Sequence, residues 1–372
     1  MRYHIRRLFP VIARAVLAVT VLAACGPVTD TRNTTLKGQH CMKVGILLPE
    51  NASSGRWETK DHPLLVTALQ QALPGVQIHT DNAEGNQDLQ YAEAKDDLNA
   101  GYCILIVAPF DSVKATTIVQ LALSYGVPVI SYDRLIQDNN VAYYVSFDNA
   151  QVGTLQGQYI VDHAASYRNG KSGNLAMLNG AQTDNNALLF KQGAHSKLDP
   201  LISNATLRLV YETFTPNWDN AVGLTEFTAA WQQSGGNIQI AYAANDGLAS
   251  SVISLLKQYH REGTVLVTGQ DATTVGIRNI LLGYQTMTIY KPIIKEVNAT
   301  AQLVAAISQG TSTAQLASQS VVTQAKGNIP SVLLTATVVD KSNVATTVIQ
   351  DGYVSKYDVC QGIPANVSPI CQ

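Results

Sequence analysis

The sequence predicts an α/β protein with two Rossmann-like lobes, each built on a parallel sheet, joined by a three-segment hinge. From residue 43 onward, short runs of β-branched and other apolar residues alternate with helical segments. Such alternation is typical of parallel sheets with right-handed crossover helices. The series begins again after residue 149, and 372 residues are more than one small core needs. Two lobes of ordinary size follow from these observations.

The elements of each lobe are assigned in chain order. In the first lobe we expect strands at 43–48, 76–80, 103–108, 127–131 and 141–147, with helices near 61–73, 87–100 and 112–125. In the second we expect strands at 174–179, 206–214, 238–243, 264–268 and 285–290, with helices at 150–166, 186–199, 219–233, 247–261 and 273–282. Helix 87–100 has Leu89, Ala92, Ala94 and Leu98 as its predicted buried side.

The chain is expected to cross between the lobes three times. Helix 293–309 returns to the first lobe, and a strand at 332–339 crosses back. The predicted N-terminal lobe is 41–147 plus 292–331, the C-terminal lobe is 148–291 plus 332–350, and 351–372 is a disulfide-closed tail. Residues at the ends of elements can absorb the dihedral changes of lobe closure.

The first 24 residues have the layout of an export signal. Arg2, Arg6 and Arg7 precede an apolar segment at 15–24 that is too short to span a bilayer. The segment ends in Ala23-Ala24-Cys25 and resembles a bacterial lipoprotein signal, which implies a lipidated Cys25 as the first mature residue. The polar stretch 25–40 is then a tether. We expect an exported protein, anchored by lipid to the outer face of the cytoplasmic membrane or held in the periplasm.

Four further cysteines form an even number in an exported chain, and three pairings are possible. Cys360 and Cys371 would close a short loop. Cys41 and Cys103 stand at the starts of two strands that we expect to be neighbours. We predict these two disulfides. Because no Cys-x-x-Cys occurs, we expect no metal or redox centre and no cofactor.

The composition is that of a globular protein, with 46% apolar and 14% charged residues. A net charge of −2 and the lack of a basic segment give no reason to expect a nucleic-acid partner.

The candidate site residues lie just past the carboxyl ends of expected strands, where ligands bind in open α/β sheets. Two tryptophans with charged and amide groups suit a neutral, polyhydroxylated ligand, because indoles offer flat apolar faces and the other groups hydrogen-bond hydroxyls. Arg56, Arg134 and Lys291 set against Asp133, Asp184 and Asp271 are near charge balance, which also favours a neutral ligand. The strand-end set is Arg56, Trp57, Asp133, Arg134, Asp184, Asn185, Asn186, Asn217, Trp218, Asn245, Asp246, Gln270, Asp271 and Lys291.

Simpler roles are open for several members. Asp133 and Arg134 can form a surface ion pair, and Lys291 can be exposed. Trp57 can be a surface or packing residue. Helix N-caps are the alternative for Asp184, Asn185 and Asn217.

Eight motifs carry a family resemblance, between about Lys43 and Gln309. They are RW (56–57), YDR (132–134), SFDN (146–149), DNNA (184–187), NWDNA (217–221), ANDG (244–247), GQDA (269–272) and QTMTIYKP (285–292). The chain resembles solute-binding lipoproteins of bacterial sugar ABC transporters, of periplasmic binding protein type I and specifically the D-xylose-binding branch. The resemblance implies a monomer that takes a monosaccharide to an ABC transporter permease.

The same resemblance implies roles for the site residues. It narrows the strand-end set to ten ligand contacts. Trp57 and Trp218 would flank the sugar ring, and its oxygens would be hydrogen-bonded by Arg56, Asp133, Arg134, Asp184, Asn186, Asn245, Asp271 and Lys291. If both indoles line a cleft and not a core, replacing them should leave the fold intact.

Three other functions are alternatives for such a chain. A secreted carbohydrate-active enzyme would use paired carboxylates as acid and base. The basic or amide neighbours of these carboxylates favour ionised acceptors instead, and G-x-S-x-G, H-E-x-x-H and G-x-G-x-x-G are absent. A transcription regulator is disfavoured by the export signal. A sugar sensor feeding a membrane receptor stays open.

Overall fold

The computed structural model describes residues 1, 38–52, 54–364 and 366–372. The expected export signal after Met1, the lipidation site Cys25 and the tether up to residue 37 therefore lie outside the described residues. Among the described residues, no helix has both the length and the apolar character needed to cross a membrane.

The first lobe contains a seven-stranded sheet in the order β11-β12-β5-β4-β3-β1-β2. Its strands are β1 (Lys43–Leu48), β2 (Gln77–Asn82), β3 (Ile104–Val107), β4 (Val129–Tyr132), β5 (Tyr143–Phe147), β11 (Gln319–Val322) and β12 (Asn328–Leu334). All neighbours are parallel except β11, which runs antiparallel to β12. Strands β3, β4 and β5 are buried throughout, which explains why they read as continuous apolar runs.

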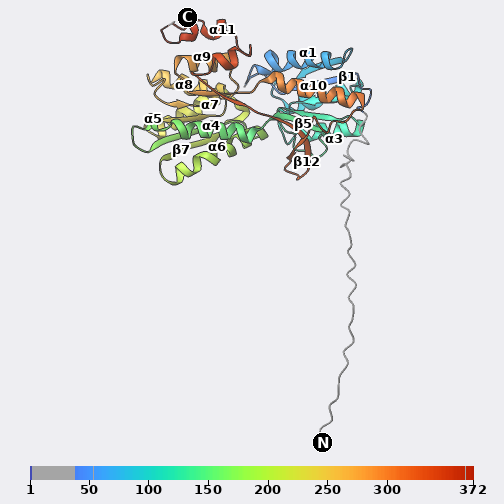
Figure 1. Ribbon diagram of the computed structural model, residues 1–372, viewed down its shortest axis with the longest axis horizontal. Helices are drawn as coiled ribbons and strands as arrows, with labels where there is room; N and C mark the ends of the chain where they lie inside the picture. The colour runs from blue at the N-terminus through green and yellow to red at the C-terminus, as the bar shows by residue number, and fades with distance from the viewer. Residues whose placement is uncertain (2–37, 53, 365) are drawn as a thin grey trace. The chain divides into compact units, whose positions relative to one another are not determined.

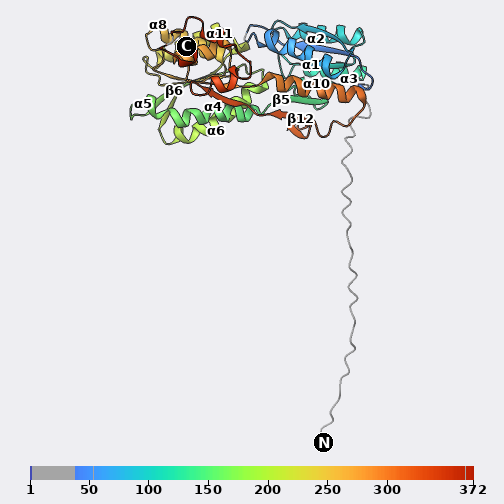
Figure 2. The same cartoon turned by 45° about the horizontal axis from the view of Figure 1, so that its top comes forward.

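Helices from both ends of the chain cover this sheet. They are α1 (His62–Ala72), α2 (Gln87–Asn99), α3 (Thr116–Tyr125) and α10 (Ile293–Gln309). Helix α10 packs along α1, so a segment from late in the chain completes the first lobe (Figure 1 and Figure 2).

The second lobe contains a four-stranded parallel sheet in the order β7-β6-β8-β9. Its strands are β6 (Gly173–Asn179), β7 (Leu207–Phe214), β8 (Ile240–Ala243) and β9 (Leu266–Val267). The helices are α4 (Asn149–His163), α5 (Ala165–Arg168), α6 (Asn185–Ser203), α7 (Asn220–Gln233), α8 (Asp246–Gln258) and α9 (Thr274–Leu282).

Two glycines allow helices α4 and α6 to pack closely. A Cβ at Gly153 would lie 1.9 Å from the carbonyl oxygen of Phe190, and one at Gly193 would lie 2.1 Å from that of Ala150. Only glycine tolerates such an approach of two backbones. The close packing fixes α6, which brings Phe190 to the pocket described below.

The expected strand at 332–339 is two strands. The first is β12, whose Leu334 pairs with Phe147 in the first sheet. The second is β13 (Thr337–Asp340), which pairs antiparallel with β10 (Met287–Tyr290). The third crossing therefore lies in the two residues between them, and residues 332–334 pair within the first lobe, not the second. The other lobe boundaries stay a proposal.

The segment expected as a C-terminal tail packs against the protein. Val354, Val359 and Ile363 of this segment join one apolar cluster with residues of α9. A short helix, α11 (Lys356–Cys360), contacts α9 within this cluster.

The predicted buried side of α2 is wrong for two of its residues. Leu89 and Ala92 are exposed, whereas Gln87, Gln90, Ala94, Asp97 and Leu98 are buried. Polar groups displace the apolar stripe because they have specific partners. Gln90 Nε2, for example, donates to the carbonyl oxygen of Ala108 at 2.9 Å.

Both predicted disulfides are present, Cys41–Cys103 and Cys360–Cys371. The first joins the chain at the starts of β1 and β3, which are parallel neighbours in the sheet. It spans 62 residues of sequence, and the second spans 11.

Removing the longer bridge should cost more stability. Chain-entropy estimates give about 4 kcal/mol for a loop of this length and about 3 kcal/mol for the shorter one. We expect the Cys41→Ser/Cys103→Ser variant to have the lower free energy of unfolding in urea titration, with Cys360→Ser/Cys371→Ser as its matched control. The reverse order would mean that unfolded-chain entropy does not set the effect.

Candidate functional site

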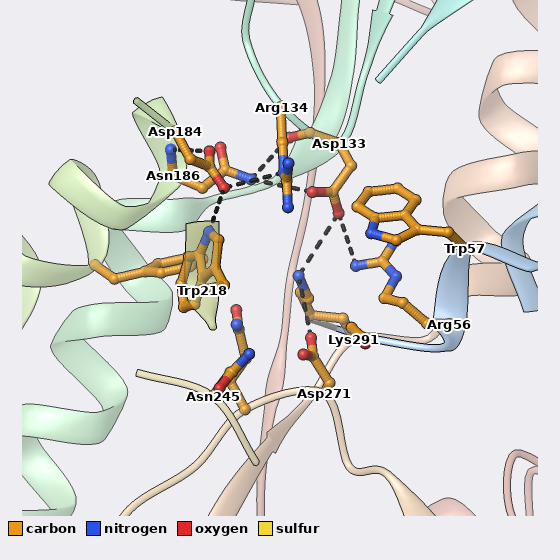
Figure 3. Close-up of a pocket in the computed structure, with 13 residues that line it drawn as sticks. Arg56, Trp57, Asp133, Arg134, Asp184, Asn186, Trp218, Asn245, Asp271 and Lys291 are labelled. Atoms are coloured by element: carbon orange, nitrogen blue, oxygen red, sulfur yellow. Dashed lines mark hydrogen bonds and ion pairs between the residues drawn. The ribbon is translucent and has the colours of Figure 1, made fainter. Parts of the chain in front are cut away.

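The structure brings all ten predicted site residues to one pocket (Figure 3). Both lobes contribute, with Arg56, Trp57, Asp133 and Arg134 coming from the first. The second contributes Asp184, Asn186, Trp218, Asn245 and Asp271, and Lys291 follows β10.

Asp133 is the centre of the polar contacts. Its Oδ2 accepts from Arg56 Nη1 at 2.9 Å and lies 3.6 Å from Lys291 Nζ, while its Oδ1 accepts from Asn186 Nδ2 at 3.1 Å. Burial alone would raise the pKa of Asp133, but Arg56, Lys291 and Arg134 outweigh it and hold the pKa well below its usual range. The carboxylate is therefore a charged acceptor at neutral pH.

The guanidinium group of Arg56 is held in place by two carboxyl groups, those of Asp61 and Glu296. Its Nε and Nη2 donate to Asp61 at 2.8 and 2.7 Å, a bidentate geometry that holds the guanidinium plane. Glu296, on α10, lies behind it at 3.6 Å from Nη2. Burial, with Asp133 next, raises the pKa of Glu296 well above its usual value.

Arg134 reaches across to the second lobe. Its Nε lies 3.0 Å from Asp184 Oδ2, which also accepts from the indole nitrogen of Trp218 at 3.1 Å. Burial raises the pKa of Asp184, although Arg134 opposes the shift. The expectation that each carboxylate is shifted toward the ionised form is therefore right for Asp133 and wrong in direction for Asp184.

The two indoles lie on opposite sides of the pocket (Figure 3). Trp57 is 2% exposed and donates from its ring nitrogen to Glu50 at 3.2 Å. The guanidinium carbon of Arg56 lies 4.5 Å from the ring centre, which fixes the ring further. Trp218 is 5% exposed and packs so closely on Gly180 that a Cβ there would lie 2.0 Å from the ring. Both indoles line the pocket as expected, but they also belong to core clusters, so the expectation that they take no part in a core is wrong.

The backbone at the pocket adopts a strained conformation in three places. Asp133, Trp218 and Asp271 have φ values of 56°, 56° and 96°, in the region that residues other than glycine rarely enter. Such strain persists only where surrounding contacts enforce it, and it clusters at functional sites. Here it aims three side chains into one pocket.

The simpler alternatives resolve differently. Asp133 and Arg134 are buried and bind other partners, and Lys291 is buried between Asp133 and Asp271. Asp184 and Asn245 each cap a helix besides lining the pocket. The cap predicted at Asn217 is provided by Asp219.

Sequence reasoning missed several residues around the pocket. Ser54 and Phe190 line it, and Glu50, Asp61 and Glu296 pack against its cations. Gln270, a member of the strand-end set outside the ten, also lines it. The expected charge balance is therefore wrong, because six carboxyl groups surround three cations. Gln270 was visible at a strand end, whereas Asp61 and Glu296 lie on helical segments, where no strand-end pattern points to them.

Direct contacts hold the two lobes together outside the pocket. The amide nitrogen of Ser112 donates to Thr183 O at 2.9 Å, and Gln137 Nε2 donates to Asn185 Oδ1 at 2.9 Å. We call Ser112, Gln137, Thr183 and Asn185 the interlobe latch. The structure therefore has the lobes in contact around the pocket.

Comparison with known proteins identifies the family. The Periplasmic binding protein domain model matches residues 44–312, more than half of the chain, and the chain belongs to this family. It is 30% identical to the D-xylose-binding periplasmic protein of Escherichia coli (strain K12), over 84% of this chain and 91% of that protein. It is 33% identical to the multiple sugar-binding periplasmic receptor ChvE of Rhizobium radiobacter, over 83% and 90%.

Solved structures agree with this assignment. A carbohydrate transporter solute binding protein from Chloroflexus aurantiacus, solved in complex with D-glucose, superposes with a TM-score of 0.74 at 29% identity. The match covers 85% of this chain and 97% of that one. The predicted fold class and family resemblance are confirmed.

Replacing Trp218 with alanine should affect both binding and stability. Loss of a buried aromatic anchor weakens binding by about 2–4 kcal/mol, and emptying a buried tryptophan site lowers stability by about 3–5 kcal/mol when the surroundings do not collapse. Calorimetric titration with D-xylose and thermal unfolding would measure the two effects.

Trp231→Ala is the matched control. Trp231 is equally buried in the same core cluster but does not line the pocket. It should lower the unfolding midpoint and leave the affinity of the folded protein unchanged. Retained affinity in Trp218→Ala would show that the indole does not contact the ligand.

Proposed function

We propose that this protein is an extracytoplasmic solute-binding lipoprotein that captures D-xylose or a close aldopyranose between its lobes and delivers it to an ABC transporter permease. The ten pocket residues named above are the proposed ligand contacts. The single observation that carries the proposal is their convergence from two lobes on one polar pocket flanked by two indoles.

The charges around the pocket favour a neutral ligand. Six carboxyl groups surround three cations, and Glu296 and Asp184 have raised pKa values because they are buried. An added anion would face uncompensated carboxylates in a buried site, which is costly. Sugar acids, phosphates and amino-acid carboxylates are therefore disfavoured.

The pocket also offers the polar groups that a sugar needs. Asp133 is a charged acceptor, and Arg56, Arg134 and Lys291 are donors. Gln270 Oε1 is buried without a hydrogen-bond partner among the described residues. A hydroxyl can donate and accept at once, so a polyhydroxylated ring suits this mixture.

Binding and lobe closure are coupled in this proposal. Asp133 and Arg134 already contact Asn186 and Asp184 across the lobes, and the interlobe latch adds further hydrogen bonds. A sugar that contacts both lobes binds the closed form better and shifts the population toward it. The closed protein would dock on the permease as a monomer, held at the membrane by lipid on Cys25.

The enzyme alternative needs a carboxylic acid poised beside a second, catalytic carboxylate. Asp133 has its pKa lowered and is committed to Arg56, so it suits an acceptor role better. Turnover of aryl glycosides above the buffer rate would favour the enzyme.

Titration with a panel of sugars tests the ligand. We expect D-xylose to bind at least tenfold more tightly than its epimers L-arabinose and D-ribose, because each unpaired buried polar group costs about 1–3 kcal/mol. D-Xylonate, which carries a carboxylate, should bind more weakly still.

The titration tests the assignment to xylose and the sugar-binding role separately. Ribose binding as tight as xylose binding would overturn the assignment to xylose and leave a sugar-binding role. Tight xylonate binding with no binding of neutral sugars would contradict both.

A further inference from the structure

A second cluster of ionisable groups lies outside the pocket, on the edge strand of the first sheet. His79 and Asp81 are two residues apart on β2, so both side chains project from the same face of the strand. Glu93 and Asp97 lie one turn apart on α2, which packs against β1 and β2. Since α2 directly follows β2, one strand–helix unit supplies all four groups.

Three of these side chains converge. His79 Nδ1 lies 2.7 Å from Asp97 Oδ1 and 3.2 Å from Asp81 Oδ2. One ligand atom from each residue lies within 4.8 Å of the others. The His79 side chain is 49% exposed, so it can adjust its position and leaves a path for an ion to enter.

The buried position of the Asp97 carboxylate is energetically unfavourable. Its side chain is 2% exposed, and Oδ2 has no hydrogen-bond partner among the described residues. A Cβ on Gly45, which pairs with His79, would lie 2.1 Å from this oxygen, so the glycine makes room for the carboxylate. Glu93 Oε2 is likewise buried without a partner. Buried carboxylate oxygens without donors are destabilising unless a cation compensates them.

The charges in this cluster also favour a bound cation. Three carboxylates, those of Asp81, Glu93 and Asp97, lie around one imidazole. The neighbouring Lys43 is engaged elsewhere, since its ammonium donates to the carbonyl oxygen of Ala100 at 3.2 Å. A divalent cation would relieve this crowding of negative charge.

We propose that His79, Asp81 and Asp97, with Glu93 beside them, bind a divalent transition-metal ion of the Zn²⁺ type. An imidazole nitrogen together with carboxylate oxygens suits such ions, whereas Ca²⁺ and Mg²⁺ prefer oxygen ligands alone. The ion would tie the edge strand β2 to α2. Sequence reasoning missed this site because its ligands are divided between a strand and the next helix, without a recognised spacing.

Titration with Zn²⁺ alone tests the proposal. Zn²⁺ would be added to the purified full chain at neutral pH and followed by calorimetry and by the thermal unfolding midpoint. We expect saturable binding that raises the midpoint. The affinity for Zn²⁺ should fall at least tenfold in His79→Gln and in Asp97→Asn. His79 is exposed and Asp97 is buried, so the two variants differ in their risk of misfolding.

His195→Gln is the matched control. His195 also contacts two carboxylates, Asp199 at 2.7 Å and Glu212 at 2.9 Å, but through opposite ring nitrogens, and Lys191 lies 2.7 Å from Glu212. These groups do not converge on one ion, so Zn²⁺ affinity should be unchanged in this variant.

The proposal is overturned if the native chain does not bind Zn²⁺, or if His79→Gln and Asp97→Asn bind it as tightly as the native chain does. The cluster would then be a protonated histidine between two aspartates. Tighter binding of Ca²⁺ than of Zn²⁺ would contradict the assigned class of ion.

Discussion

The buried contacts of Asp133 with Arg56 and Lys291 are the constraint on which the pocket depends. A carboxylate with this little exposure is stable only if cations and donors surround it. Meeting that requirement brings together the end of β4, the helical turn after β1 and the segment after β10. Because the same carboxylate accepts from Asn186 in the other lobe, the charge network that stabilises the site also links the lobes.

The rest of the site follows from this network. Each cation has at least one further carboxylate, with Asp61 and Glu296 at Arg56, Asp184 at Arg134 and Asp271 at Lys291. The indoles are fixed by hydrogen bonds to Glu50 and Asp184, so their faces keep their position without a ligand. Such preorganisation reduces the entropy that a ligand must lose on binding. The same charge network accounts for the positive φ values at Asp133 and Asp271, because it holds both side chains toward the pocket.

The predictable part of the structure is the part that depends on local pattern. Alternating strands and helices give the lobes, and the rule that ligands bind past parallel strand ends gives the strand-end candidates, because it needs no knowledge of the packing. The family resemblance narrows these candidates to the ten pocket residues. Side chains recruited by packing were not predictable. Asp61 and Glu296 contact Arg56 from helical segments. Leu89 has the sequence pattern of a core residue but is exposed, because Gln90 and Asp97 occupy the buried face of α2. Patterning also joined 332–339 into one strand, since nothing local marks a change of sheet after Leu334.

The central claim is that the charge of Asp133 holds both the site and its ligand. Calorimetric titration of D-xylose into the Asp133→Asn variant tests it most directly, because asparagine keeps the shape of the side chain but removes its charge and replaces one acceptor oxygen with a donor. The account predicts a loss of affinity of at least about tenfold, since a hydrogen bond to a charged group contributes about 1.5–3 kcal/mol. Circular dichroism would verify that the variant is folded. Affinity within threefold of the native protein would contradict the account.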